Sequence, residues 1–241
     1  MSLLREDRFL GGRLTLCQPM DGFRAGLDAV MLAAAVAGAP AVAGGAALEL
    51  GAGVGTVSLC LASRVAGVRI VGVEIDPALA DIANANAAAN GLSDRVSFVA
   101  GDALDLPADL RRQFDLVFCN PPFYGAGGEV SPVAAKARAK MDGGTLGQWL
   151  DAGIKRTRSG GGFTAIIGAD RLGEALAVLP TGGVSVIPLW PKAAVPAKRI
   201  ILRVRRGARS PLVLHRDDGS YTPAAEVILR AGAGLPNPLP I

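Results

Sequence analysis

A short apolar run gives way to a helical pattern at Leu48-Glu49-Leu50-Gly51-Ala52-Gly53-Val54-Gly55-Thr56, through a turn that contains three glycines. Glycine allows the backbone to turn sharply and lets a ligand approach it with no Cβ in the way. A strand, a glycine-rich turn and a helix in this order are typical of ligand-binding α/β folds. The turn therefore predicts further strands and helices in alternation along the rest of the sequence.

Apolar runs of strand length recur along the chain. They predict seven strands, at Ala46–Leu50, Arg69–Glu74, Val96–Ala100, Asp115–Cys119, Phe163–Gly168, Val184–Leu189 and Ile200–Arg205. Helical patterns lie before and between them, at Leu27–Ala37, Thr56–Val65, Pro77–Asn90, Leu146–Thr157 and Arg171–Leu179. Continuous apolar strands that alternate with helices indicate an α/β fold with a doubly wound, mostly parallel seven-stranded sheet.

The sheet is expected to form one core with additions at both ends. We predict an N-terminal appendage at residues 1–45, the core at 46–209, and a C-terminal extension at 210–241 that is not a separate domain. The appendage begins with a predicted hairpin at Phe9–Gln18, around Gly11-Gly12, and continues into a helix. Within the core, the stretch Asn84–Asn90 predicts a solvated helix face.

Composition limits the kinds of protein that this chain can be. Half of its 241 residues are hydrophobic and its net charge is +4, so a buried core can form and an anionic partner is permitted. The uncharged stretch 29–48 is interrupted by Pro40 and Gly44-Gly45, and no cleavable basic leader precedes it, so we expect neither a membrane span nor a signal peptide. Three cysteines without metal-site spacing and a single histidine, His215, predict no metal site and a reduced, cytoplasmic setting.

The acidic residue beside the glycine turn indicates the type of cofactor. Glu49 stands two positions before the first glycine, where a carboxylate would repel a pyrophosphate but suits a cofactor with a cationic amino acid end. The dinucleotide-binding turn also requires a glycine or alanine three residues after its second glycine, and this chain has Thr56 there. These residues favour S-adenosylmethionine over a nicotinamide dinucleotide.

The next two strands end in further acidic residues. Glu74 is predicted to accept hydrogen bonds from both ribose hydroxyls of the cofactor. Asp76 is the alternative, although its place before Pro77 suits a helix N-cap. Asp102 is predicted to accept from the adenine amino group of the cofactor, with an Asx turn as the alternative. The predicted cofactor site on the core comprises Glu49, Gly51, Ala52, Gly53, Gly55, Glu74, Ile75, Asp102, Ala103 and Asn120.

The fourth strand ends at Asn120-Pro121-Pro122-Phe123. The Asn120 side-chain oxygen and the Pro121 carbonyl can both accept hydrogen bonds from a planar amino group, and the prolines hold these acceptors still by fixing φ. The ring of Phe123 offers a face on which a flat base can stack. We predict that these four residues are the catalytic group for methyl transfer to an amino nitrogen, although Asn-Pro is also an ordinary turn signal.

As a pair, the glycine turn and the Asn-Pro-Pro-Phe tetrapeptide resemble the class I S-adenosylmethionine-dependent methyltransferases, over roughly residues 26–206. Three other stretches are similar to the bacterial tRNA(Val) anticodon-loop adenine N6-methyltransferases and their relatives, at 22–32, 198–200 and 218–222. The resemblance implies that Asp28 reaches toward the cofactor; a helix N-terminal acid stabilised by the macrodipole is the alternative. The Ala/Gly/Pro-rich tail departs from the family, so no substrate contact is carried over to it.

The same resemblance implies adenine N6 in a tRNA anticodon loop as the acceptor. A loop base is also a cheaper target than a paired one, since extrusion from a duplex costs on the order of a few kcal/mol. We predict that Phe123 and Tyr124 line the acceptor pocket. Beside them lie basic residues that can contact phosphate or only solvent: Lys136, Arg138 and Lys140. A protein glutamine, a small-molecule amine and a catalytically silent cofactor-binding module stay open as alternatives.

Overall fold

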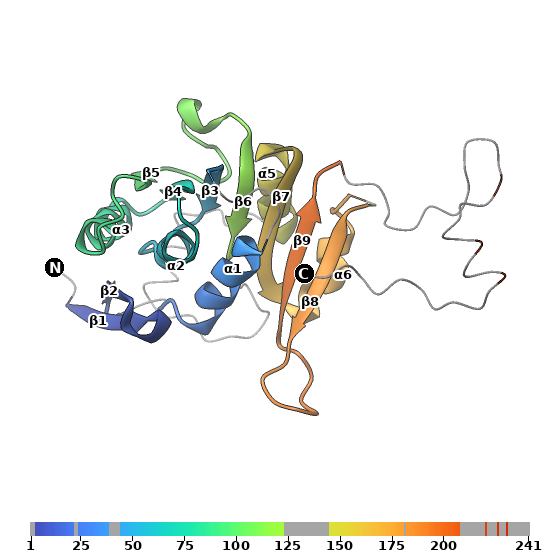
Figure 1. Cartoon of the computed structure of the whole chain (residues 1–241), viewed down its shortest axis with the longest axis horizontal. Helices are drawn as coiled ribbons and strands as arrows, with labels where there is room; N and C mark the ends of the chain where they lie inside the picture. The colour runs from blue at the N-terminus through green and yellow to red at the C-terminus, as the bar shows by residue number, and fades with distance from the viewer. Residues whose placement is uncertain are drawn as a thin grey trace.

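A seven-stranded sheet forms the centre of the molecule (Figure 1). The computed structural model describes residues 3–21, 24–38, 44–122, 145–180 and 182–207, together with positions 220, 226 and 230. The strands lie in the order β5-β4-β3-β6-β7-β9-β8, and all neighbouring pairs from β5 to β7 are parallel, whereas β9 runs antiparallel to both of its neighbours. The predicted doubly wound, mostly parallel α/β sheet is confirmed.

The bounds of the elements agree closely with the predicted ones. The sheet consists of β3 (Ala46–Leu50), β4 (Arg69–Glu74), β5 (Val96–Ala100), β6 (Phe114–Cys119), β7 (Thr157–Gly168), β8 (Val184–Leu189) and β9 (Arg199–Arg205). The α-helices that flank it are α1 (Leu27–Ala37), α2 (Thr56–Arg64), α3 (Pro77–Ala89), α5 (Leu146–Arg156) and α6 (Leu172–Leu176).

Two elements differ from the prediction. β7 begins at Thr157 rather than Phe163, because the glycines at 160–162 hide the apolar pattern of a strand while their backbone still pairs with β6 and β9. The helix predicted at Arg171–Leu179 is shorter, since a 3-10 turn at Ala169–Arg171 precedes α6 and the helix ends at Leu176. The first difference lies at the end of the sheet opposite the predicted site, whereas the second follows the carboxyl end of β7, which is parallel to β6.

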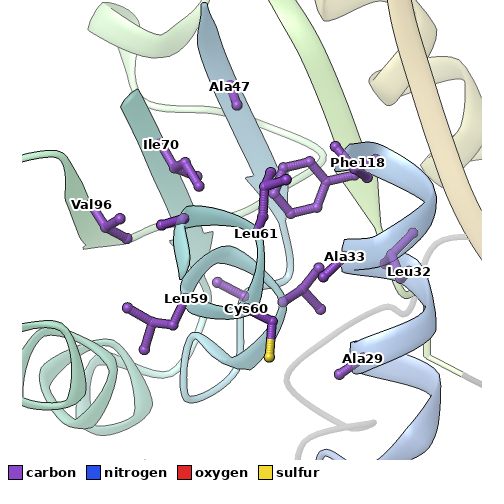
Figure 2. Close-up of a cluster of buried hydrophobic side chains, with 14 of the residues drawn as sticks. Ala29, Leu32, Ala33, Ala47, Leu59, Cys60, Leu61, Ile70, Val96 and Phe118 are labelled. Carbon is purple, nitrogen blue, oxygen red and sulfur yellow. The ribbon is translucent and has the colours of Figure 1, made fainter. Parts of the chain in front are cut away.

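Helices bury both faces of the sheet. On one face, α1 and α2 pack over the strands, and Figure 2 shows Ala33 of α1 and Leu61 of α2 close to Phe118 of β6. On the other face, α5 and α6 cover a second cluster that includes Trp149 and Leu150. Burial of one large apolar side chain contributes about 1.5–3 kcal/mol, so these two clusters supply most of the favourable free energy of folding.

An N-terminal hairpin, β1 (Leu4–Phe9) and β2 (Leu14–Pro19), packs against α3 outside the main sheet (Figure 1). Asn86 of α3 donates from Nδ2 to the carbonyl of Cys17 at 3.0 Å and accepts from the Cys17 N–H at 2.8 Å. Asn90 pairs in the same way with Thr15, at 2.8 and 3.1 Å. The two amides therefore take the place of a neighbouring strand at the edge of β2.

The prediction of a solvated face at Asn84–Asn90 is therefore wrong. Asn86 is 3% exposed, and its Nδ2 also donates to the carbonyl of Val54 in the glycine turn, at 3.0 Å. Asn84 makes the corresponding pair of bonds with Phe98 of β5, at 2.8 and 2.9 Å. Both side chains satisfy backbone groups of distant segments, and Asn86 connects the hairpin to the glycine turn.

We expect Asn86→Ala to lower the free energy of unfolding by about 2–4 kcal/mol, because it leaves the backbone groups of Cys17 and Val54 without their partners. Urea denaturation measures this loss. Hydrogen exchange then locates it: the Cys17 amide should lose protection in Asn86→Ala and keep it in the matched variant Asn84→Ala, which unpairs Phe98 instead. Equal protection of the Cys17 amide in both variants would contradict this account of the hairpin.

Two absences hold for the residues that the structure describes. Among them, no helix is long and apolar enough to cross a membrane. The same residues contain no group of three or more His, Cys, Asp or Glu side chains that could hold a metal ion.

Candidate cofactor and acceptor site

The carboxyl ends of four neighbouring strands bring the predicted site residues to one edge of the sheet. Leu50, the last residue of β3, is in register with Val73 of β4 and with Cys119 of β6. Glu74 of β4 is in register with Ala100 of β5. The glycine turn, Glu74, Asp102 and Asn120 therefore begin at the ends of adjacent strands, where open α/β sheets bind their ligands.

The glycine turn has a backbone that requires glycine. Gly51, Gly53 and Gly55 have φ angles of +71°, +55° and +84°. The N–H groups of Gly51 and Ala52 both donate to the carbonyl of Val73, at 2.9 and 3.0 Å, so the turn is held against the end of β4. A Cβ at Gly55 would lie 2.5 Å from Cζ of Phe98, whereas a Cβ at Gly53 would meet no atom within 4 Å. Gly55 thus faces the core, and Gly53 faces open space.

Glu74 is connected to this turn. Its Oε2 accepts from the N–H of Gly53 at 2.7 Å, and its Oε1 accepts from the N–H of Asp76 at 3.0 Å. The residue is 8% exposed. An ionised carboxylate has about four acceptor sites, so each oxygen retains capacity for one more donor. This arrangement suits the predicted bonds to two ribose hydroxyls.

Asp76 and Asp102 each make the local backbone contact that was named as a structural alternative to cofactor binding. Asp76 caps α3, since its side chain accepts from the N–H of Ala78 at 2.9 Å. Asp102 forms an Asx turn with the N–H of Leu104 at 2.8 Å, through Oδ1. The Asp102 side chain is exposed, and its second oxygen makes no hydrogen bond with the residues that the structure describes. Asp102 can therefore form the turn and still accept from a ligand.

Glu49 lies beneath the turn rather than on its open side. It is 1% exposed, and its Oε2 accepts from the hydroxyl of Ser58 and, at 3.2 Å, from the Ser58 N–H. Burial raises the pKa of Glu49 to about 8, although the Ser58 bonds lower it, and the nearby charge of Glu74 adds to the increase. At neutral pH the Glu49 carboxyl is therefore mainly protonated, and it joins the turn to the first part of α2.

The pKa of Glu49 predicts how stability depends on pH. The fold favours the protonated form, because the pKa is about 8 in the folded protein against an ordinary value of 4.5. The resulting stabilisation is complete below pH 4.5 and is lost as the pH rises to 8 and above. In Glu49→Gln, which stays neutral, this loss should be absent.

We expect the free energy of unfolding of the wild type to fall relative to that of Glu49→Gln, by on the order of a few kcal/mol, across this pH interval. Urea denaturation of both proteins at the two ends of the interval measures the difference. Parallel pH profiles for the two proteins would show that Glu49 ionises at its ordinary pKa.

Asn120 follows β6 and carries an unusual buried acceptor. Its Oδ1 is buried and has no hydrogen-bond partner in the part of the chain that the structure describes. Leaving such a group unpaired costs about 1–3 kcal/mol. Asn120 also lines a pocket of about 240 Å³, together with Arg24, Gly26, Leu27, Asp28 and Ala29. An acceptor without a partner beside a pocket is suited to a ligand that donates a hydrogen bond.

Asp28 reaches this pocket from the first turn of α1. Its Oδ2 accepts a hydrogen bond from Nε of Arg199 in β9 at 3.0 Å. This bond joins the start of α1 to the antiparallel part of the sheet. The structure thus places Asp28 beside Asn120, as lining residues of one pocket.

Five predicted residues fall outside the described residues: Phe123, Tyr124, Lys136, Arg138 and Lys140.

Sequence reasoning missed three residues that the structure brings to the site. Arg24 and Leu27 line the pocket, and the ring of Trp149 lies against Gly51, since a Cβ there would be 2.9 Å from Cη2. Arg24 and Leu27 lie within the stretch 22–32, whose resemblance to the family gave them no role of their own. The contact of Trp149 with Gly51 joins residues that are far apart in the sequence. A buried thiol next to the tetrapeptide, Cys119, has a pKa raised by burial and is unsuited to act as a nucleophile.

Comparison with known proteins agrees with this geometry. Residues 47–139 match a family described as a methyltransferase domain. The segment 47–139 of this chain is thus similar to a methyltransferase domain. The matched region begins in β3 and includes the glycine turn, Glu74, Asp102 and the Asn-Pro-Pro-Phe tetrapeptide.

Two curated relatives are similar to parts of this chain. A tRNA1(Val) (adenine(37)-N6)-methyltransferase of Porphyromonas gingivalis is 38% identical over 125 residues, which is 49% of this chain and 48% of the relative. An enzyme of the same name from Aeromonas hydrophila is 28% identical over 208 residues, 83% of this chain and 85% of the relative. The chain thus spans about half of the first relative and most of the second.

A solved structure shows the same fold. The Thermus thermophilus 16S rRNA N2 methyltransferase RsmC, in complex with AdoMet and guanosine, superposes with a TM-score of 0.61. It is 22% identical, and the match covers 85% of this chain and 50% of RsmC. At this identity the likeness establishes the fold alone.

Proposed function

We propose that this chain is an S-adenosylmethionine-dependent methyltransferase that acts on an exocyclic amino nitrogen, adenine N6 in the anticodon loop of a tRNA. The observation that carries the proposal is Asn120, which lines a pocket and whose buried Oδ1 has no partner among the described residues. An amino group is a donor that such an oxygen can accept from. The two tRNA adenine N6-methyltransferases among the relatives support the choice of acceptor.

The residues present fit the cofactor. Gly53 offers a backbone that no neighbouring atom covers, and the two oxygens of Glu74 have capacity for ribose hydroxyls. Asp102 is assigned to the adenine amino group of the cofactor, and Asp28, which lines the pocket with Asn120, is assigned as a further cofactor contact. When bound, S-adenosylmethionine supplies an electrophilic methyl group on a sulfonium. The AdoMet present in RsmC supports the same assignment.

The chain's own residues position the acceptor. Asn120 Oδ1 and the Pro121 carbonyl are assigned as acceptors for the two hydrogens of the amino group, which favours a pyramidal nitrogen with an available lone pair. With the cofactor bound, the nitrogen would take the methyl as the bond between that methyl and the sulfur breaks, which leaves S-adenosylhomocysteine. The nitrogen would then lose one proton to water, so no strong base is required. Enforced attack geometry can contribute about 7–11 kcal/mol. Phe123 is assigned to stack on the base, which contributes about 1–3 kcal/mol of binding.

The proposed substrate contacts also include Tyr124, which is assigned to the acceptor pocket. Three basic residues are assigned to phosphate: Lys136, Arg138 and Lys140. Phosphate contacts set register and affinity without reading sequence. An RNA loop suits this design, because its target base needs little unstacking.

The test is transfer of labelled methyl from S-adenosylmethionine to unmodified tRNA transcripts, with release-factor protein and duplex DNA as parallel acceptors. We expect label in tRNA as N6-methyladenosine, and its loss in Asn120→Ala. Label in the release factor instead would assign the site to a protein glutamine. Cofactor binding without label in any acceptor would leave a small-molecule amine or a silent module.

A further inference from the structure

The residues that line the pocket with Asn120 include two that the proposed mechanism does not use. Leu27 is 74% exposed, although the apolar residues that follow it on α1 are buried at Ala29, Leu32 and Ala33. Arg24 is 46% exposed and lines the same pocket. A single exposed leucine is ordinary, but this one stands beside a pocket that also contains a buried acceptor without a partner.

We propose that Arg24 and Leu27 form an RNA-contact site, in which Leu27 packs against an unpaired base and Arg24 binds a backbone phosphate. This inference rests on the proposed function, since it names the contacts of the same acceptor. It assigns RNA recognition to the N-terminal segment as well as to the residues after the tetrapeptide.

Arg24 is held in place for such a contact. Its Nη2 donates to both oxygens of Asp7 of β1, at 3.0 and 3.1 Å. A guanidinium has five N–H donors, so this pairing leaves donors for a phosphate. Arg5 also pairs with Asp7 at 3.1 Å, so two cations share one carboxylate and the cluster has a net positive charge.

A buried glutamine fixes the segment that carries Arg24 and Leu27 to the hairpin. Gln18 of β2 is 1% exposed and donates from Nε2 to Asp7 at 3.0 Å and to the Ala25 carbonyl at 3.3 Å. Its Oε1 accepts from the Ala25 N–H at 2.9 Å. The hairpin is in turn held on α3 by Asn86 and Asn90. The backbone beside Arg24 and Leu27 is therefore positioned before any substrate binds, which lowers the entropic cost of binding.

Equilibrium binding of an unmodified tRNA anticodon stem-loop, measured by fluorescence anisotropy in the presence of S-adenosylhomocysteine, tests the site without relying on turnover. Arg24→Gln should weaken binding and lower the slope of log K against log salt by about 0.7, as for one lost phosphate contact on a single strand. Leu27→Ala should weaken binding about tenfold, or about 1.4 kcal/mol, with the salt slope unchanged. Calorimetric affinity for S-adenosylhomocysteine alone should be unchanged in both variants.

Two matched controls lie away from the pocket. Arg171→Gln removes a partly buried arginine that pairs with Glu174 at 2.8 and 2.9 Å, and Leu176→Ala removes a leucine that is 50% exposed on α6. Neither should change RNA affinity or its salt slope. An unchanged slope in Arg24→Gln, or a loss of S-adenosylhomocysteine affinity in Leu27→Ala, would overturn the inference.

The outcome separates this inference from the proposed function. A wild-type protein that binds the stem-loop through these residues but does not methylate it would refute the proposed function alone. A wild-type protein that methylates tRNA while both variants bind it normally would refute the RNA-contact site alone. A wild-type protein that does not bind the stem-loop would overturn the inference directly.

Discussion

Asn120→Ala is expected to lower kcat by about 10²–10³-fold, the loss measured when one preorganised hydrogen-bonding group is removed from a reacting centre. The same substitution should leave the melting temperature unchanged or raise it. Asn120 Oδ1 is buried and has no partner among the described residues. Its removal therefore eliminates the free-energy cost of a desolvated, unpaired oxygen, and that oxygen makes no hydrogen bond with the described residues that could be lost. Single-turnover methyl transfer and thermal denaturation measure the two effects.

Asn84→Ala provides the reciprocal control. Asn84 pairs with the backbone of Phe98 at 2.8 and 2.9 Å and lies outside the pocket. Its loss should lower stability by about 1–3 kcal/mol, while kcat persists at temperatures where the variant is folded. If Asn120→Ala lost stability and activity together, as a structural residue would, the assignment of Asn120 as the acceptor would be wrong.

The sequence predicted the sheet and the placement of its strand ends because those signals are local. Continuous apolar runs such as Val96–Ala100 and a turn such as Gly51–Gly55 each specify their own backbone. Once the strands are parallel, their carboxyl ends must meet at one edge, so Glu74 and Asn120 could be placed near each other from spacing alone.

Contacts between distant residues could not be predicted in this way. Asn86 looks solvated in a helical pattern, and its partner Cys17 is 69 residues away. Glu49 was expected to face a cationic ligand, but its orientation toward Ser58 depends on how α2 packs under the turn. The proximity of Leu27 to Asn120 likewise depends on where the N-terminal segment lies. Each of these contacts depends on tertiary packing, which cannot be predicted from the hydrophobic periodicity or the composition of a single sequence.

Gly53→Ala is expected to weaken S-adenosylmethionine binding by at least about tenfold, or about 1.4 kcal/mol, in a protein that still folds. A Cβ at Gly53 would meet no protein atom within 4 Å, so it would project into the space assigned to the cofactor. The φ of +55° adds a strain of about 1–2 kcal/mol. Isothermal titration calorimetry measures the affinity, and thermal denaturation shows that the fold is retained.

Two glycines that differ from Gly53 in one property each make this prediction specific. Gly91 has a φ of +64° and also no atom within 4 Å of a Cβ, but it lies at the end of α3, so Gly91→Ala should carry the same strain with unchanged cofactor affinity. Gly55 has a φ of +84° and a Cβ position 2.5 Å from Phe98, so Gly55→Ala should destabilise the fold itself. Normal cofactor affinity in a folded Gly53→Ala protein would mean that the cofactor does not occupy the open side of the turn. Gly91→Ala, which carries the same backbone strain away from the turn, shows how much of any change in affinity is due to strain alone.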